Sequence, residues 1–496
     1  MKKGVIIVVV LLLVIVGLWG GATYWFGVKT EQQYQLLLQK ASQSRHFKFV
    51  NESYQRGFLS SKARSIMQIQ SSPGVTPDDQ PIKITLDHEI THGPFPILGS
   101  SQGDSQFKPL MAVFDTKIVL APESQAQFKD VLAQVPELGS IRDQTTLYLD
   151  GNGEEKFVVP PFKRSLGGED KVAVDWKGLT LQVNFTRDLK GFKGTLNVPG
   201  VDVVAKDINL KVREVKSDFN MKEGVSDLSL GDASLTLTDL EIVETEEAKP
   251  STFHLRGFNV HTSNKAAGDN INSLLAIRTD QMKLEDIQYG PGVFELEFRN
   301  LDAASIAKLQ KMLREVDAQP QEQQSEEATE MLSLAKYGEI LAGLLRKSPE
   351  IEITKFDVKT TEGDFTAKAK VSFDGTKTGP DFNILALANA ISAQADCKVG
   401  ERLLRRLLSV TTKDNIIAEM KEKSGDDDSE LDSDLPDEKE LNALVSSAVE
   451  EQLKGLMQQG LLQKADGEYR SSASCKAGQI VLNGRPISLQ DLMMGN

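Results

Sequence analysis

Two histidines, His88 and His92, are the residues whose type and spacing come closest to a reactive site. Between residues 82 and 92, Ile, Leu and His alternate with Lys, Thr, Asp and Glu, so both imidazoles share one face of an extended strand. Asp87 and Glu89 point to the other face. The two rings are about 13 Å apart along the strand, too far to bind one zinc ion unless the strand bends. We therefore predict packed or hydrogen-bonded histidines, and neither metal binding nor catalysis.

No other stretch supplies a reactive arrangement. The G-x-S-x-G turn, the Walker loop and the H-E-x-x-H helix are absent from the chain. Residues 426–440 hold nine acids and one lysine, but the glycine of an EF-hand calcium loop is missing, which favours a solvated linker. We expect no enzyme activity, no metal and no cofactor.

The two cysteines, Cys397 and Cys475, are candidates for a disulfide. A single pair fits one bridge in an oxidising compartment, and two unrelated buried thiols are the alternative. Closing a loop of this length would stabilise the fold by ~4 kcal/mol in the chain-entropy model. We favour the bridge.

The N-terminus has the features of a membrane anchor. Lys2 and Lys3 precede a run without charge, Gly4 to Val28, and no second run of this kind follows. As a helix the run measures about 37 Å, enough to cross a hydrocarbon core of about 30 Å. Aromatic residues that suit the headgroup level gather near its end: Trp19, Tyr24, Trp25 and Phe26. The lysines favour a cytoplasmic N-terminus, with the body outside. A signal peptide cleaved near Gly20-Gly21-Ala22 is the alternative.

The composition argues against nucleic acid as a partner. The net charge is −14 and the sequence pI is about 5.1. Because affinity for nucleic acid comes largely from neutralising phosphates, such a surface repels a polyanion. The expected partner is membrane lipid, through the N-terminal helix.

The dominant local pattern has a period of two residues, which predicts strands with one apolar and one wet face. It recurs in six segments: 82–92, 179–185, 208–212, 235–237, 294–298 and 365–373. Helical spacing of apolar residues appears in four others, near 301–316, 334–345, 403–408 and 441–456. We therefore predict an α+β, mainly β fold, in which a transmembrane helix precedes a large antiparallel sheet, elongated or curved, with packed helices.

This pattern divides the chain into six predicted regions. They are a transmembrane signal anchor (1–28), a β-rich region (29–300), a helical hairpin (301–348), a second β segment with a helix (349–423), an acidic linker (424–440) and a C-terminal helix with a β-hairpin (441–496).

Four short motifs carry a resemblance to a known family. They are Gly20 to Trp25 leading to Lys29 and Glu31, Tyr54 to Ser61, His92 to Pro96, and Gly478 to Gly484 with Ser488 to Asp491. In order and spacing they resemble the YdgA family of bacterial envelope proteins. The resemblance implies an inner-membrane protein of a Gram-negative bacterium with its body in the periplasm, self-association and no established activity. The candidate residues are Tyr54, Arg56, Gly57, Ser60, Ser61, His92, Gly93, Pro94, Phe95, Pro96, Asn483 and Gly484.

The motifs also have a direct physical interpretation. Gly57 suits a bulge or tight turn where a side chain would not fit. Arg56 has the chemistry to bind a lipid phosphate, but a structural pair with an acid at the turn is favoured. Pro94 and Pro96 end the strand after His92, because proline supplies no ladder donor.

Two functions from different classes are consistent with these features. The first is a membrane-anchored structural or binding protein that presents its loops to envelope partners. The second is a lipid-binding or lipid-transfer protein with an apolar groove, because predicted strands outnumber the helices available to cover them. Its strand-rich, singly anchored layout is similar to AsmA-like envelope proteins. A groove requires an exposed apolar patch well above a few hundred Å².

Overall fold

The computed structural model describes most of the chain. The described residues are 2–42, 47–69, 82–96, 109–120, 124, 133–167, 171–245, 251–284, 287–317, 337–377, 389–424 and 438–487, without the side chains of residues 2–16, 314–317, 419–424 and 438. Ser488–Asp491 of the fourth motif and most of the acidic linker lie outside this set. The chain forms two compact units, one comprising residues 1–252 and 311–320 and the other residues 253–310 and 321–496.

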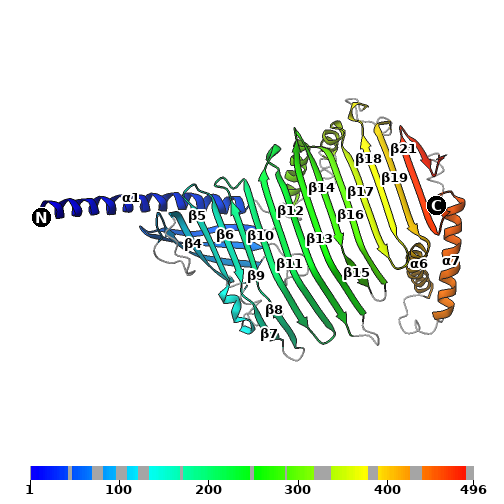
Figure 1. Ribbon diagram of the computed structural model, residues 1–496, viewed down its shortest axis with the longest axis horizontal. Helices are drawn as coiled ribbons and strands as arrows, with labels where there is room; N and C mark the ends of the chain where they lie inside the picture. The colour runs from blue at the N-terminus through cyan, green and yellow to red at the C-terminus, as the bar shows by residue number, and fades with distance from the viewer. Residues whose placement is uncertain are drawn as a thin grey trace. The chain divides into compact units, whose positions relative to one another are not determined.

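The described residues of unit 1 form a long helix, short helical turns and antiparallel strands (Figure 1). The helix is α1 (Lys2–Ala41). The strands are β1 (Phe47–Arg56), β2 (Ser60–Ile69), β3 (Ile82–His92), β4 (Leu110–Leu120), β5 (Arg142–Tyr148), β6 (Gly153–Val159), β7 (Phe162–Leu166), β8 (Val172–Trp176), β9 (Leu179–Phe185), β10 (Gly191–Val204), β11 (Ile208–Glu223) and β12 (Ser229–Glu244). Strands β1 to β6 pair in succession, β9 joins β6 to β10, and β10 pairs with β11 and β11 with β12. Strand β8 pairs with β7 and with the far end of β10.

Unit 2 is built of antiparallel strands and helices. Its strands are β13 (Ser251–Ala267), β14 (Asn270–Thr279), β15 (Gln281–Leu284), β16 (Ile287–Asp302), β17 (Glu350–Thr360), β18 (Phe365–Phe373), β19 (Ile391–Gly400), β20 (Gln463–Ala465), β21 (Glu468–Lys476), β22 (Gln479–Leu482) and β23 (Arg485–Ile487). The spatial order is β13, β14, β16, β17, β18, β19, β21, β22, β23, while β15 pairs with β13 and β16, and β20 with β21. Its described helices are α3 (Ala303–Asp317), whose last residues from 311 on are grouped with unit 1, a helix over residues 337–346, α6 (Glu401–Ser424) and α7 (Glu438–Gln458).

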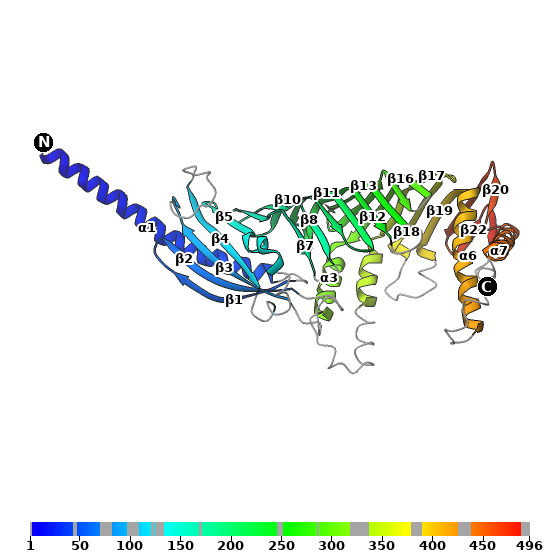
Figure 2. The ribbon, with the colours of Figure 1, turned by 90° about the horizontal axis from the view of Figure 1, so that it is seen from below.

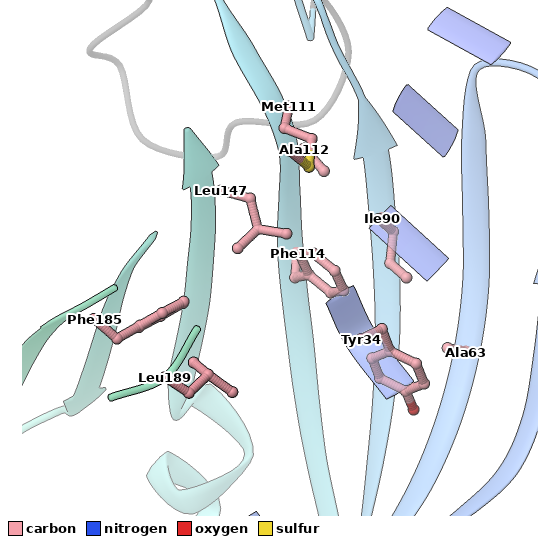
Figure 3. Close-up of a cluster of buried hydrophobic side chains, with 9 residues drawn as sticks. All are labelled: Tyr34, Ala63, Ile90, Met111, Ala112, Phe114, Leu147, Phe185 and Leu189. Carbon is pink, nitrogen blue, oxygen red and sulfur yellow. The ribbon is translucent and has the colours of Figure 1, made fainter. Parts of the chain in front are cut away.

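A buried cluster in unit 1 joins α1 to the sheet. Helix α1 lies along the first strands and contacts β1, β3 and β4 (Figure 2). Tyr34 of α1 points into the sheet beside Phe114 and Ala63, and Ile90 lies close by (Figure 3). The Tyr34 and Phe114 rings are stacked with their centroids 6.3 Å apart. Burial of such large side chains contributes about 1.5–3 kcal/mol each, which holds the second half of α1 on the sheet.

A second cluster lies in unit 2, where α6 and α7 pack against β19 and β21. Leu403, Val445 and Leu453 of the helices are buried together with Val399 and Tyr469 of the strands. Their spacing along α6 and α7 is the helical one that predicted both segments.

The mainly β, antiparallel fold predicted from the alternating pattern is confirmed. Segments 82–92, 179–185 and 365–373 are β3, β9 and β18. Among the helices whose side chains the structure describes, none is both long and apolar enough to cross a membrane. The side chains of residues 2–16, which form much of the predicted anchor, lie outside that set.

Candidate functional site

Two of the motifs form neighbouring turns at one end of the unit 1 sheet. In the turn between β1 and β2, the Gly57 amide donates to the Ser60 carbonyl at 2.9 Å, and a Cβ on Gly57 would lie 2.5 Å from that oxygen. After β3, the Gly93 amide donates to the Met111 carbonyl at 2.7 Å, and a Cβ there would lie 1.7 Å from the Leu110 oxygen. Only glycine fits at either position. The two turns are joined where the His92 amide donates to the Leu59 carbonyl at 2.9 Å.

Helix α1 runs beside these turns, with Gly20 and Gly27 facing them. A Cβ on Gly20 would lie 3.3 Å from the Phe58 ring, and one on Gly27 would lie 2.8 Å from the His92 ring. Thr23 and Thr30, on the same side of the helix, are buried. We call the two turns, residues 56–61 and 92–96, together with residues 18–31 of α1, the collar.

Charged residues tie the collar together. The Arg56 guanidinium donates to Glu31 at 2.8 Å and lies over the Tyr24 ring, 5.6 Å from its centroid. Lys29 lies over the Trp25 ring at 5.9 Å. The ion pair is about a third exposed, so its contribution is at most about 1 kcal/mol. Arg56 thus has the structural acid partner that the sequence favoured.

The closest approach to a catalytic pair is Ser61 with His92. His92 Nδ1 lies 3.2 Å from the Phe58 carbonyl oxygen, which can only accept, so Nδ1 carries the proton and Nε2 accepts from the Ser61 hydroxyl at 2.9 Å. Burial lowers the pKa of His92, which keeps the ring neutral. Both side chains are at most 3% exposed beneath α1, so a substrate cannot reach them. The pair fastens β2 to β3 under the helix.

His88 occupies a similar position further along β3. Its Nδ1 lies 2.9 Å from the Thr116 hydroxyl and its Nε2 lies 3.1 Å from the Ser65 hydroxyl. The Tyr34 ring meets it edge-on at 5.4 Å. Burial lowers the pKa of His88 to about 4. Both histidines are therefore neutral and hydrogen-bonded, as the strand pattern predicted.

A pair of acids continues this polar row onto the next two strands. Pairing of Thr116 with Asp143 places Asp143 of β5 on the face of His88, and Glu155 of β6 lies diagonally beside it. Burial raises the pKa of Asp143 to about 6, opposed by the Thr116 hydroxyl. Burial and the charge of Asp143 raise the pKa of Glu155 to about 7. Asp143 Oδ1 is buried and has no hydrogen-bond partner among the described residues.

The charged residues of these strands border a hollow of about 780 Å³. Most of its lining comes from the positions opposite the histidine face, including Lys62, Arg64, Asp87, Glu89 and Lys117. Arg64 and Asp87 pair at 2.6 Å. Within the described part of the chain, no group of three or more His, Cys, Asp or Glu is placed to hold a metal ion.

The fourth motif is a turn that clamps the end of unit 2. Asn483 and Gly484 link β22 to β23 with φ of 49° and 79°, the left-handed values of a two-residue hairpin turn. The Asn483 side chain accepts from the Ser472 amide at 2.8 Å and donates to the Gly460 carbonyl at 2.7 Å. The residue joins β21, the hairpin and the end of α7, which is a structural role.

The predicted disulfide between Cys397 and Cys475 is wrong for this structure, in which both cysteines are free. Cys397 of β19 lies opposite Ser471, and Cys475 of β21 lies opposite Ala393. The thiols share one face of the sheet but are offset by four residues, about 13 Å along the strands. A disulfide requires Cα atoms within about 7 Å, so the pairing register prevents it.

Comparison with family models gives a match over residues 1–490. The chain belongs to the family described as bacterial protein of unknown function (DUF945). The match covers the collar and the Asn483-Gly484 turn, so the expectation of an uncharacterised bacterial family is confirmed. No curated protein and no solved structure gives a significant match.

In this DUF945 protein the sequence pattern missed Ser65, Thr116, Asp143 and Glu155. The sequence did not show which face Asp143 and Glu155 occupy, because β5 and the first half of β6 lack a clear alternation of apolar residues. The strand pairing brings these residues into one row with His88. The arrangement offers no accessible nucleophile, and it serves to hold the helix and strands together.

Proposed function

We propose that this DUF945 protein is a membrane-anchored protein of the bacterial cell envelope that binds the acyl chains of lipids on the open apolar faces of its sheets. The observation that carries this function is that the strands β16 to β19 of unit 2 have one charged face and one apolar face, and that part of the apolar face is not covered by other described residues. The YdgA-like motifs and the AsmA-like layout support the same class of protein.

In unit 2 the two faces differ sharply. On one face, Arg299 forms ion pairs with Glu297 at 2.6 Å and Glu352 at 2.7 Å, and Lys370 pairs with Glu350 at 3.0 Å. The other face carries the apolar residues of β16 to β19. Phe294, Phe356 and Phe365 form a row of edge-to-face rings with centroids 5.3 and 4.9 Å apart.

This apolar face is open where β17 begins and β18 ends. Ile351 and Val371, which lie opposite each other on β17 and β18, are 44% and 43% exposed. The cluster around α6 and α7 covers only the β19 and β21 end. Soluble proteins usually leave few neighbouring large apolar side chains exposed, so these residues have the environment of a binding surface.

Unit 1 has a less regular arrangement on β9 to β12. One face holds ion pairs such as Arg213 with Asp202 at 2.6 Å and Lys211 with Glu241 at 2.9 Å. By strand alternation the same face carries Leu181, Leu196, Val198, Val215 and Leu237 towards the other end of these strands, whereas Val212 and Leu240 lie on the opposite face. The apolar residues of both sets are only partly buried, and Phe192 and Leu235, on the face of Leu196, are exposed.

An acyl chain suits these faces because it needs apolar contact and no hydrogen bonds. The backbone groups in the middle of both sheets are already paired, so lipid contact leaves none of them unsatisfied. The anchor proposed from Gly4 to Val28 would keep the faces close to a lipid source, with the body in the periplasm. Self-association through the same faces is the competing outcome.

The test is purification of the full chain in mild detergent, followed by mass spectrometry of the bound lipid. Val371→Lys places a charge on the open face, and Ser372→Lys places the same charge on the opposite face one residue away. We expect phospholipid with the wild-type and Ser372→Lys proteins and a large loss with Val371→Lys. Equal lipid in all three, or none in the wild type, would overturn lipid binding. A dimer lost only in Val371→Lys, without bound lipid, would assign the face to self-association.

A further inference from the structure

The collar has an exposed apolar rim that the lipid-binding faces do not explain. Phe58 and Leu59, at the tip of the first turn, are 53% and 43% exposed, and Phe95, at the tip of the second turn, is 40% exposed. Directly beneath them, Ser61 and His92 are buried. The turns therefore expose large apolar side chains while polar residues of the same motifs point inward.

The tip of the first turn lies beside exposed apolar side chains of α1. Phe58 contacts the helix at Gly20, and the neighbouring helix residues Leu18, Tyr24 and Trp25 are all more than half exposed. Phe58 thus meets α1 at a level where the helix itself exposes apolar side chains, and His92 meets it seven residues further on, at Gly27.

The level of contact along α1 indicates a lipid environment. Gly20 lies inside the uncharged run that ends at Val28. If the run enters the membrane at Gly4, a core of about 30 Å accommodates about 20 residues of helix and ends near Thr23. Phe58 then lies within a few ångströms of the outer boundary of the core, where aromatic side chains are favoured.

The turns are also suited to leave water. The amides of Gly57, His92 and Gly93 are all hydrogen-bonded within the turns. Insertion of the tips therefore removes apolar area from water without leaving these donors unpaired. Arg56 and Lys29 lie over Tyr24 and Trp25, which places two cations at the level of the lipid phosphates.

We infer that Phe58, Leu59 and Phe95 insert into the outer interface of the membrane beside α1, so that unit 1 is held against the bilayer at three points. This inference rests on the anchor of the proposed function, and it does not depend on lipid binding by the sheets. It gives the two motifs a role: their buried residues lock α1, and their tips contact the membrane.

The test uses single cysteines in the full chain with Cys397→Ser and Cys475→Ser as background. Leu18→Cys, Phe58→Cys and Phe95→Cys are each labelled with an environment-sensitive fluorophore and reconstituted into phospholipid vesicles that contain a headgroup-level nitroxide lipid. Val204→Cys, exposed on the charged face of β10, is the control. Circular dichroism checks that every variant is folded.

We expect a loss of fluorescence at positions 58 and 95 comparable to that at position 18, and none at position 204. Quenching at 18 alone would overturn the inference and leave the anchor intact. No quenching at 18 would overturn the anchor and the inference together. Lipid-free purified protein would count against acyl-chain binding only.

Discussion

At the scale of single residues, the collar depends on close contacts that only glycine permits. Gly27 touches the His92 ring, whereas nothing lies within 4 Å of the position that a Cβ on Gly21 would take. Both glycines are in α1, so helix propensity affects them equally. The difference between them isolates the packing of the helix on the histidine.

Gly27→Ala should therefore destabilise unit 1, because the added methyl group must displace the His92 ring from its bond to Ser61. Overpacking of this kind costs about 1–3 kcal/mol. Gly21→Ala should be neutral or slightly stabilising, by up to about 1 kcal/mol. Thermal unfolding of both variants in detergent measures the difference. Equal melting temperatures would mean that His92 does not lock the helix.

The acid pair makes unit 1 sensitive to pH. An acid whose pKa is raised by folding favours the folded state below its ordinary pKa, and this contribution is lost as the pH rises through the folded value. For Glu155 the window runs from the ordinary 4.5 to about 7. Glu155→Gln should raise the stability at pH 8 by about 1–3 kcal/mol relative to wild type and change it little at pH 4.5. Glu89→Gln is the control, because Glu89 of β3 points to the face of the sheet opposite the histidines. Melting curves of the variants at both pH values measure the difference in stability.

The histidines act in the opposite direction. Because burial lowers the pKa of His88 to about 4, its contribution is complete above about pH 6.5 and is lost as the pH falls towards 4. His88→Gln should therefore flatten the loss of stability between pH 6.5 and 4, while Ser65 and Thr116 keep a hydrogen-bonding neighbour. Denaturant unfolding across this range measures the slope. An unchanged acid slope would remove His88 as a titrating group.

At the scale of elements, the two ends of the chain are fastened by short turns. Asn483 contributes its left-handed backbone and three side-chain hydrogen bonds, at 2.8, 2.7 and 3.2 Å, to β21 and to the end of α7. Glycine would preserve the backbone conformation and remove the side chain, whereas alanine would remove both. Comparing the two variants therefore separates the contribution of the turn conformation from that of the side-chain hydrogen bonds.

Asn483→Gly should cost about 1–3 kcal/mol, because the Ser472 amide and the Gly460 carbonyl lose a partner. Asn483→Ala should cost about 1 kcal/mol more, since the left-handed conformation is strained for alanine. Hydrogen exchange of the β21 amides, compared with those of β17, reports the local effect. If both variants exchange like the wild type, the clamp does not stabilise the hairpin.

At the scale of the whole molecule, the proposal requires an N-terminus in the cytoplasm and a body outside it. Alkaline phosphatase fused after Asn496 should be active in a bacterial host, and β-galactosidase at the same position should be inactive, because each enzyme works in one compartment. Removing residues 2–28 should abolish the phosphatase signal. The reverse pattern would contradict the predicted orientation.

The sequence by itself determined the mainly β class, the one-faced character of the strands and several boundaries, because the period of two depends only on neighbours along the chain. It also indicated that His88 and His92 share a face. Tertiary structure alone decided which strands pair, and hence that Cys397 faces Ser471 and that Asp143 and Glu155 join the histidine row. It also placed Phe58 beside Gly20 and His92 beside Gly27 of α1. These outcomes depend on register and on contacts between distant segments, where a shift of one residue exchanges the faces of a strand and no local pattern records the choice.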